Sequence, residues 1–237
     1  MQKIELGNII IEVEQKDIKN IHLSVYPPNG RVKISAPNRM DIDTIRVFAI
    51  GKLQWIRKQQ EVFRNQEREA PREYLSKESH YFKGKRYLLN VIEINDTPKV
   101  ILKHSKIDLY VRPNITKEKR KEILDKWYRT ELKIIVSEMI EKWEQKIGVK
   151  ANEFGIKKMR TKWGTCNTDA KRIWLNLELA KKPIDCIEYI VVHELVHLLE
   201  RSHNDRFIKL MNKYMPKWQL YRAELNRLPF RHTEWRY

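Results

Sequence analysis

The sequence predicts an α+β protein with a small antiparallel, β-rich N-terminal part over residues 1–113 and a helical C-terminal part over residues 114–237. Two observations predict this division. Short runs of alternating apolar residues, separated by turn-forming residues, are concentrated before residue 113, and longer apolar stripes of helical period are concentrated after it. With 237 residues, of which 41% are hydrophobic, the chain is long enough for one large domain or two small ones.

The N-terminal part is predicted to contain two groups of strands with one helix between them. Alternation predicts strands at residues 9–13, 21–25, 32–36, 87–94, 100–102 and 107–111. The segment Pro27-Pro28-Asn29-Gly30 between the second and third strands is typical of a hairpin. Residues 41–68 have the apolar period of one amphipathic helix with a basic outer face, and the polar run over 71–79 ends it. No internal repeat is evident.

The C-terminal part is predicted to be built on helices. A long helix over 116–147 ends at Gly148 and carries one apolar stripe, formed by Leu124, Tyr128, Leu132, Ile135, Met139, Trp143 and Ile147. Alternation over 171–179 predicts a strand. A second helix begins near residues 183–185, where Asp185 and Glu188 have the spacing of a capping box.

The most informative residues are His193-Glu194-Leu195-Val196-His197 and the later His203. Residues four apart lie on one face of a helix, so His193 and His197 can direct imidazole nitrogens at one ion. A zinc ion with three protein ligands keeps one position for water and lowers the pKa of that water to about 7. Glu194 lies beside this face and is placed to take the proton of the water. These residues predict a zinc site suited to hydrolysis.

His203 can join the other two histidines only if the helix ends near residues 200–202, since six further helical residues would turn it away. Ser202 or Asn204 can then cap a last helix, which carries Phe207, Leu210, Met211 and Tyr214.

Alternatives to this ligand set stay open at this point. Asp205 and Glu224 are rival carboxylates for the third ligand position, and histidines on a helix surface need not bind metal at all. Glu200 lies on the His193 face but is better explained as a solvated or supporting group.

Four segments in the last third of the chain carry a family resemblance. They are Arg160-Thr161-Lys162-Trp163-Gly164-Thr165-Cys166, Arg172-Ile173-Trp174-Leu175-Asn176, Val191-Val192-His193-Glu194-Leu195-Val196-His197 and His203-Asn204-Asp205-Arg206-Phe207. The stretch over 159–228 resembles the YgjP-like metallopeptidases and, more distantly, the SprT-like proteases. Thr165 stands where the family usually has serine. Metzincins have a turn-forming glycine where this chain has Glu200, which argues against membership of that group.

The resemblance implies a C-terminal zincin-type metallopeptidase domain that contains the motif helix and hydrolyses peptide bonds. It also implies Zn²⁺ as the cofactor, His193, His197 and His203 as its ligands, and Glu194 as the general base. In zincin-type proteases a strand bordering the cleft can pair with an extended peptide, and main-chain groups over 174–177 are the candidates here. Asn176, Arg160 and Lys162 are further candidates for substrate contacts.

Composition sets the remaining expectations. The chain has no apolar run long enough to span a membrane and no N-terminal signal pattern, so we expect a cytoplasmic protein. With only Cys166 and Cys186, a disulfide framework is excluded; Cys166 could bind metal but is better explained as a structural thiol.

The net charge of +17, from 48 basic and 31 acidic residues, makes nucleic acid a candidate partner beside a peptide or protein substrate. Dispersed lysines on solvated helix faces explain the same charge without any partner. The charge therefore supports a second functional hypothesis, a nucleic-acid-associated protein whose zinc is structural and whose hydrolytic activity is small or absent.

Overall fold

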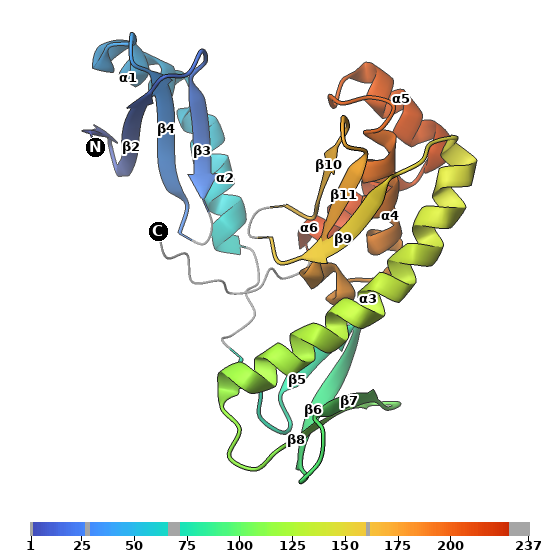
Figure 1. Cartoon of the computed structure of the whole chain (residues 1–237). Coiled ribbons are helices and arrows are strands. Elements are labelled where there is room, and N and C mark those ends of the chain that lie inside the picture. The colour runs from blue at the N-terminus through green and yellow to red at the C-terminus, as the bar shows by residue number, and fades with distance from the viewer. Residues whose placement is uncertain (1, 27–28, 66–71, 160–161, 228–237) are drawn as a thin grey trace. The chain divides into compact units, whose positions relative to one another are not determined.

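The computed structural model describes residues 2–26, 29–65, 72–159 and 162–227 of a mixed α+β chain (Figure 1). The chain divides into two compact units, residues 1–68 and 69–237. This boundary differs from the expected one at residues 113 and 114. The strands between residues 79 and 111 share a hydrophobic core with the long helix that follows them, through Phe82, Leu89 and Leu109 on the sheet and Leu124 and Tyr128 on the helix.

Unit 1 contains one sheet and two helices. Its elements are β1 (Gln2–Leu6), β2 (Ile9–Lys16), β3 (His22–Tyr26), β4 (Arg31–Pro37), α1 (Ile42–Gly51) and α2 (Leu53–Asn65). The strand order is β1-β2-β4-β3. The hairpin of β3 and β4 is confirmed, but the sheet is mixed rather than antiparallel, because β2 pairs with β4 in parallel. Ile4, Ile11 and Ile34 of the sheet and Ile45 and Ile56 of the helices are fully buried in its core.

The single helix expected over 41–68 is two helices. The Asp41 carboxylate caps α1 by accepting a hydrogen bond from the Thr44 amide at 2.8 Å. Lys52 then leaves the helical conformation (φ −106°, ψ 1°), directly after Gly51, and α2 begins at Leu53. Glycine is a weak helix former, which explains a break at this position. Residues 66–68 of the expected helix lie outside the described residues.

Unit 2 contains the remaining elements. They are β5 (Ser79–Phe82), β6 (Lys85–Glu93), β7 (Lys99–Leu102), β8 (Lys106–Val111), α3 (Lys117–Ile147), β9 (Glu153–Lys157), β10 (Gly164–Asn167), β11 (Arg172–Asn176), the 3₁₀ helix η1 (Leu177–Lys181), α4 (Ile184–Val196), α5 (Asp205–Tyr214) and α6 (Trp218–Arg227). Strands β6, β7 and β8 and helices α3 and α5 confirm predictions made from periodicity. The strand predicted over 171–179 is confirmed only as β11, because residues 177–179 belong to η1. Strands β1, β5, β9 and β10 were not anticipated.

The two four-stranded sheets have the same topology. The second has the order β5-β6-β8-β7. In both sheets the first two strands form an antiparallel hairpin, the second strand pairs in parallel with the fourth, and the third strand is antiparallel at the far edge. Each fourth strand leads through a Pro-Asn pair, Pro37-Asn38 and Pro113-Asn114, to a capped helix. The structure therefore contains a repeated ββββα unit that the sequence did not reveal.

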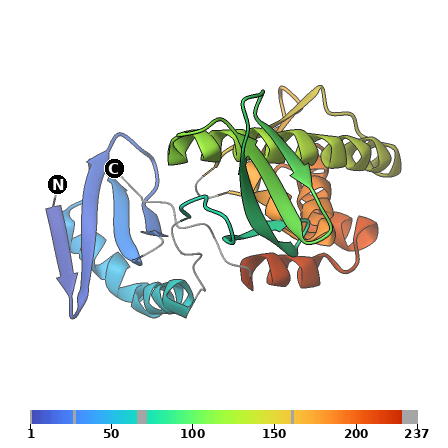
Figure 2. The same ribbon diagram turned by 90° about the horizontal axis from the view of Figure 1, so that it is seen from below.

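Helix α3 connects the parts of unit 2. Thr116 caps its first turn, and Gly148 ends it in the left-handed conformation (φ 77°). Figures 1 and 2 show β5–β8 against its N-terminal half, where the Tyr128 hydroxyl donates to the Tyr81 carbonyl at 2.9 Å. In its C-terminal half, Trp143 Nε1 donates to Glu188 of α4 at 2.8 Å. Across the described residues, no helix combines the length and apolar character that crossing a bilayer requires.

Candidate metal centre

Helix α4 carries the motif and is almost entirely buried. Its N-terminus differs from the expected capping box, since Pro183 occupies the N-cap position and makes no side-chain cap. Glu188 instead accepts hydrogen bonds from Lys142 (2.7 Å) and Trp143 (2.8 Å) of α3. These contacts, together with the apolar core, fix the position of α4 against α3.

The end of α4 lies at Val196, four residues or more before the expected position, with His197 as the C-cap. Tight turns follow, in which the Leu198 and Leu199 amides donate to the carbonyls three residues earlier at 3.0 and 2.9 Å. The chain then reverses, and Asn204 caps α5 by accepting from the Phe207 amide at 3.0 Å. This confirms Asn204 rather than Ser202 as the cap and returns residue 203 to the end of α4.

Three imidazoles meet where the chain reverses. Nε2 of His193 lies 3.2 Å from Nε2 of His197 and 3.0 Å from Nε2 of His203. The metal-ligating atoms of the three residues all lie within 4.8 Å of one another. Tetrahedral ligands at the usual Zn–N distance of about 2.05 Å are separated by about 3.3 Å. The spacing therefore fits three nitrogen ligands of one ion.

The surroundings favour this use of the nitrogens. The Nδ1 atom of His197 lies 3.0 Å from the carbonyl oxygen of Glu200, so Nδ1 carries the proton and Nε2 is left as an acceptor for a cation. The Phe207 ring contacts all three imidazoles, with centroid distances of 4.9, 4.7 and 4.8 Å to His193, His197 and His203. Phe207 was expected only as a core residue of α5, yet it also supports the three rings.

The rival ligands lie elsewhere. Glu224 Oε2 accepts from the Cys186 thiol at 3.8 Å, on the side of α4 toward its N-terminus. Asp205 lies in the first turn of α5. Within the described part of the chain, the only group of three or more metal-capable side chains is His193, His197 and His203. The Glu200 side chain lies 3.8 Å from Arg206 and takes no place in this group.

Electrostatics favour neutral imidazoles. Burial lowers the pKa of His193 to about 3, and the neighbouring His197, His203 and Arg222 act in the same direction. Burial also lowers the pKa of His197. A metal-ligating histidine must be unprotonated, so these shifts keep the group ready for a cation at neutral pH.

The Glu194 side chain lies against the backbone at the start of β10. Glu194 is 4% exposed, and burial raises the pKa of its carboxyl to about 8, against the opposing effect of Lys162. A Cβ atom on Gly164 would lie only 2.4 Å from Glu194 Oε1, so only glycine fits there. A glycine in a strand signals such a close approach, but the sequence does not show which residue approaches. The contact between Gly164 and Glu194 was therefore not predicted.

The three-stranded sheet of unit 2 has the order β10-β11-β9. Strand β11 is already paired on both sides, with β10 and with β9. The expectation that main-chain groups over residues 174–177 pair with a peptide is therefore wrong. Among the residues that the structure describes, the edge strand without a second partner beside α4 is β10, which was expected as a turn. The carbonyls of Met159 and Lys162, which precede β10 in the chain, are bound by Asn176.

Asn176 is 2% exposed and acts as a clamp rather than as a substrate contact. Its Nδ2 donates to the carbonyls of Met159 (2.9 Å) and Lys162 (2.8 Å), and its Oδ1 accepts from the Glu178 amide at 3.2 Å. Arg160 lies outside the described residues. Cys166 is half-buried against the core and is absent from the histidine group; burial and Glu194 raise the pKa of its thiol to about 11, which suits a structural thiol.

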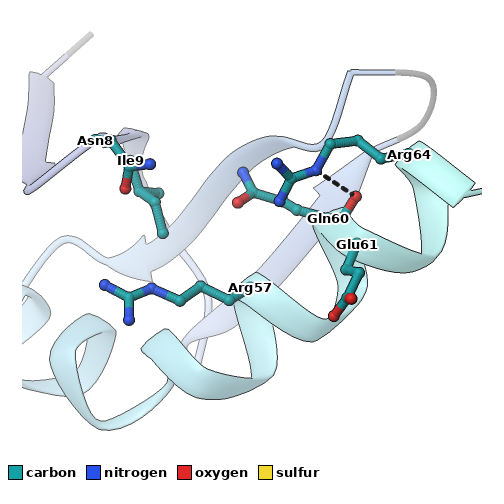
Figure 3. Close-up of a pocket in the computed structure, with 6 residues that line it drawn as sticks. All are labelled: Asn8, Ile9, Arg57, Gln60, Glu61 and Arg64. Carbon is teal, nitrogen blue, oxygen red and sulfur yellow. Dashed lines mark hydrogen bonds between the residues drawn. The ribbon is translucent and has the colours of Figure 1, made fainter.

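Unit 1 has a pocket of its own, between the β1–β2 turn and α2 (Figure 3). Its volume is about 480 Å³, and it is lined by Asn8, Ile9, Arg57, Gln60, Glu61 and Arg64. Figure 3 shows Glu61 pointing away from Asn8 and Ile9. With one carboxylate and no histidine or cysteine in its lining, this pocket offers no set of metal ligands.

Comparison with known proteins agrees with the geometry of unit 2. A family model described as "YgjP-like, metallopeptidase domain" matches residues 19–228. The chain belongs to the YgjP-like metallopeptidase family. The match includes every residue of the histidine group and most of both units of this YgjP-like chain.

Two solved structures are similar to part of the YgjP-like chain. The metallopeptidase zymogen abylysin of Pyrococcus abyssi is 18% identical, with 40% of this chain and 99% of that chain covered and a TM-score of 0.36. The zymogen jannalysin of Methanocaldococcus jannaschii is also 18% identical, with 38% and 92% covered and a TM-score of 0.35. No curated protein matches the YgjP-like chain significantly in sequence.

Proposed function

We propose that this metallopeptidase is a zinc enzyme in which His193, His197 and His203 hold the ion and Glu194 is the general base. The convergence of three imidazole Nε2 atoms, 3.0 and 3.2 Å apart around His193, carries this proposal. We assign the activity to unit 2, residues 69–237, which contains all four residues.

The number of ligands favours catalysis over a structural role for the metal. Structural zinc sites are closed by four protein ligands, whereas catalytic sites use three. Within the described residues only three ligand side chains gather, and His203 is exposed, which leaves one side of the group accessible. This argues against the alternative of a nucleic-acid-associated protein with structural zinc. Association with nucleic acid itself stays a prediction from the net charge.

When bound, zinc supplies a Lewis acid that polarises the scissile carbonyl and makes a water acidic at neutral pH. The Glu194 carboxylate accepts a proton from the attacking water and later donates it to the nitrogen of the leaving amine. Without a cation nearby, the buried carboxyl keeps its proton at neutral pH, because its pKa is about 8. A positive charge on the histidine group favours the ionised form, which is the form that can act as the base.

The free edge of β10 is the place where an extended peptide can pair with the enzyme. The main-chain groups of residues 164–167 that are not bonded to β11 can pair there with a substrate strand. The Gly164 backbone brings this edge into contact with Glu194, so that a peptide on the edge passes beside the base.

Metal content and peptide cleavage should be measured together on wild type, His193→Ala, Glu194→Gln and the matched control His104→Ala. His104 is an exposed histidine outside the histidine group. We expect one zinc per chain and cleavage of casein or fluorogenic peptides by wild type and His104→Ala. His193→Ala should lose both, and Glu194→Gln should keep the zinc and lose the cleavage.

Stoichiometric zinc without cleavage would contradict the peptidase function, and cleavage that Glu194→Gln leaves unchanged would contradict the assignment of the base. Zinc retained by His193→Ala would contradict the ligand set. The assignment of the base and the ligand set are tested separately, because Glu194→Gln removes only the proposed base and His193→Ala removes a proposed ligand.

A further inference from the structure

Helix α6 borders the histidine group through a row of stacked rings. Tyr189 lies one turn before His193 on α4, with ring centroids 5.8 Å apart in an edge contact. The Trp218 ring of α6 stacks on Tyr189 at 6.3 Å with an interplanar angle of 17°. One turn further along α6, the Arg222 guanidinium lies 5.9 Å from the Trp218 centroid. The row of rings therefore places the Arg222 guanidinium near the histidine group.

Lys162 brings a second cation to the site from the sheet. It lies two residues before Gly164, whose backbone contacts Glu194, and its carbonyl accepts a hydrogen bond from the buried Asn176 at 2.8 Å. The main chain at Lys162 is thus fixed, while its side chain is exposed. Both cations therefore belong to segments that contact the site: Lys162 precedes the glycine that touches Glu194, and Arg222 follows the tryptophan that stacks beside Tyr189.

Neither cation forms an ion pair with any residue that the structure describes. Other basic groups close to this region do so: Lys142 pairs with Glu188 at 2.7 Å, and Arg206 lies 3.8 Å from Glu200. The site therefore combines a buried base with two unpaired positive groups, one from the sheet edge and one from α6.

We propose that Arg222 and Lys162 bind a carboxylate of the substrate, so that the enzyme prefers peptides with aspartate or glutamate near the scissile bond. The planar guanidinium can bind a carboxylate with two parallel hydrogen bonds, and the ammonium adds a flexible point charge. This inference rests on the proposed peptidase function and names its substrate class. Because both cations are at least partly in solvent, we expect a preference of about tenfold, the order of one charge-assisted hydrogen bond.

The test uses pairs of fluorogenic peptides that differ only by glutamate or glutamine at one position near the cleaved bond. The ratio of kcat/KM within each pair is measured for zinc-loaded wild type, Arg222→Gln, Lys162→Gln and Arg222→Glu. The matched control is Arg227→Gln, which removes the same charge from the end of the same helix, where the residue is exposed. We expect wild type and Arg227→Gln to favour the glutamate peptide about tenfold, the order of one charge-assisted hydrogen bond. The two glutamine variants should lose most of this ratio, and Arg222→Glu should reverse it.

Binding of the same peptides to zinc-loaded Glu194→Gln, read by fluorescence anisotropy, separates this inference from the proposed function. A preference for glutamate in binding that Arg222→Gln removes supports the inference even if no peptide is cleaved, a result that would contradict the peptidase function alone. Equal binding and equal kcat/KM within every pair would overturn it. It would also be overturned if a single-stranded oligonucleotide bound through Arg222 while the peptides were not discriminated.

Discussion

The two four-stranded sheets have one topology but different uses. In unit 1, the following helices have 10 and 13 residues, with a break at Lys52, and their apolar side chains pack with the sheet into one small core. In unit 2, the helix that follows the sheet has 31 residues, about 46 Å at 1.5 Å per residue, and extends past the sheet to α4. Helix length, rather than sheet topology, thus separates a self-contained ββββα unit from one that supports a metal site.

The largest expected effect comes from removing a buried leucine or isoleucine from each core. Leu132 of α3 and Ile34 of β4 are both fully buried. Each alanine substitution should cost about 2–5 kcal/mol of unfolding free energy through lost burial and a cavity. Hydrogen exchange followed by mass spectrometry should show Leu132→Ala opening α3 and α4 with loss of cleavage, and Ile34→Ala opening only unit 1. Equal opening of α4 in both variants would contradict the separation.

The second contrast concerns one glycine from each region. Gly164→Ala places a Cβ 2.4 Å from Glu194 Oε1, whereas nothing lies within 4 Å of the equivalent position on Gly51. Displacing a catalytic group by about 1 Å can cost roughly 100-fold in rate, so Gly164→Ala should lower kcat by this order with zinc content unchanged. Gly51→Ala, assayed beside it, should cleave at the wild-type rate. An active Gly164→Ala would show that the carboxylate does not depend on this contact.

The third contrast pairs His80 with Ile4, which occupy the same position of the first hairpin in the two sheets, two residues before the end of its first strand. His80 is 2% exposed, and its Nε2 lies 3.6 Å from Glu78 Oε1. Burial, with Arg72 and Lys181, lowers the pKa of His80 to about 3, so the imidazole is neutral and this contact is not an ion pair.

Because the folded state resists protonation, stability from His80 is present above the unfolded pKa of about 6.5 and is lost as the pH falls toward 3. The loss by pH 4 is of the order of 3 kcal/mol. His80→Ile, which installs the residue of unit 1, should reduce the acid sensitivity of unit 2. Calorimetric melting temperatures between pH 7 and pH 4, with a chelator present, test this. Parallel curves for the two proteins would exclude His80 as the cause.

The smallest expected effect is on Gly51 itself. Gly51 lies in the last turn of α1 with open space around it, so alanine should stabilise unit 1 by about 0.5–1 kcal/mol through helix propensity. Chemical denaturation read by exchange in β2 and β4 measures this. A lower midpoint would mean that the break at Lys52 needs the freedom of glycine.

Local signals account for what the sequence predicted. Thr116 and Gly148 mark the ends of α3, and the spacing of His193, His197 and His203 predicts the group that the structure brings together. Signals of pairing between distant segments were absent. Alternation within a strand does not say which other strand pairs with it. The parallel pairing of β2 with β4 and the place of β10 at the edge of its sheet were therefore not predicted. The hydrogen bond from Asn176 to the Met159 carbonyl likewise joins residues that are distant in the sequence. The repeat was missed for the same reason, since Ile4 and His80 share a position but no chemistry.

The hydrogen bond from His197 to the Glu200 carbonyl has a consequence for how this site can vary. Its acceptor belongs to the main chain, so any side chain at position 200 can supply it, and point mutations there should be tolerated. Insertions or deletions between Val196 and Asn204 should not be, because they would move the carbonyl and the third imidazole together. Natural variation in this turn is therefore expected in residue identity and not in length.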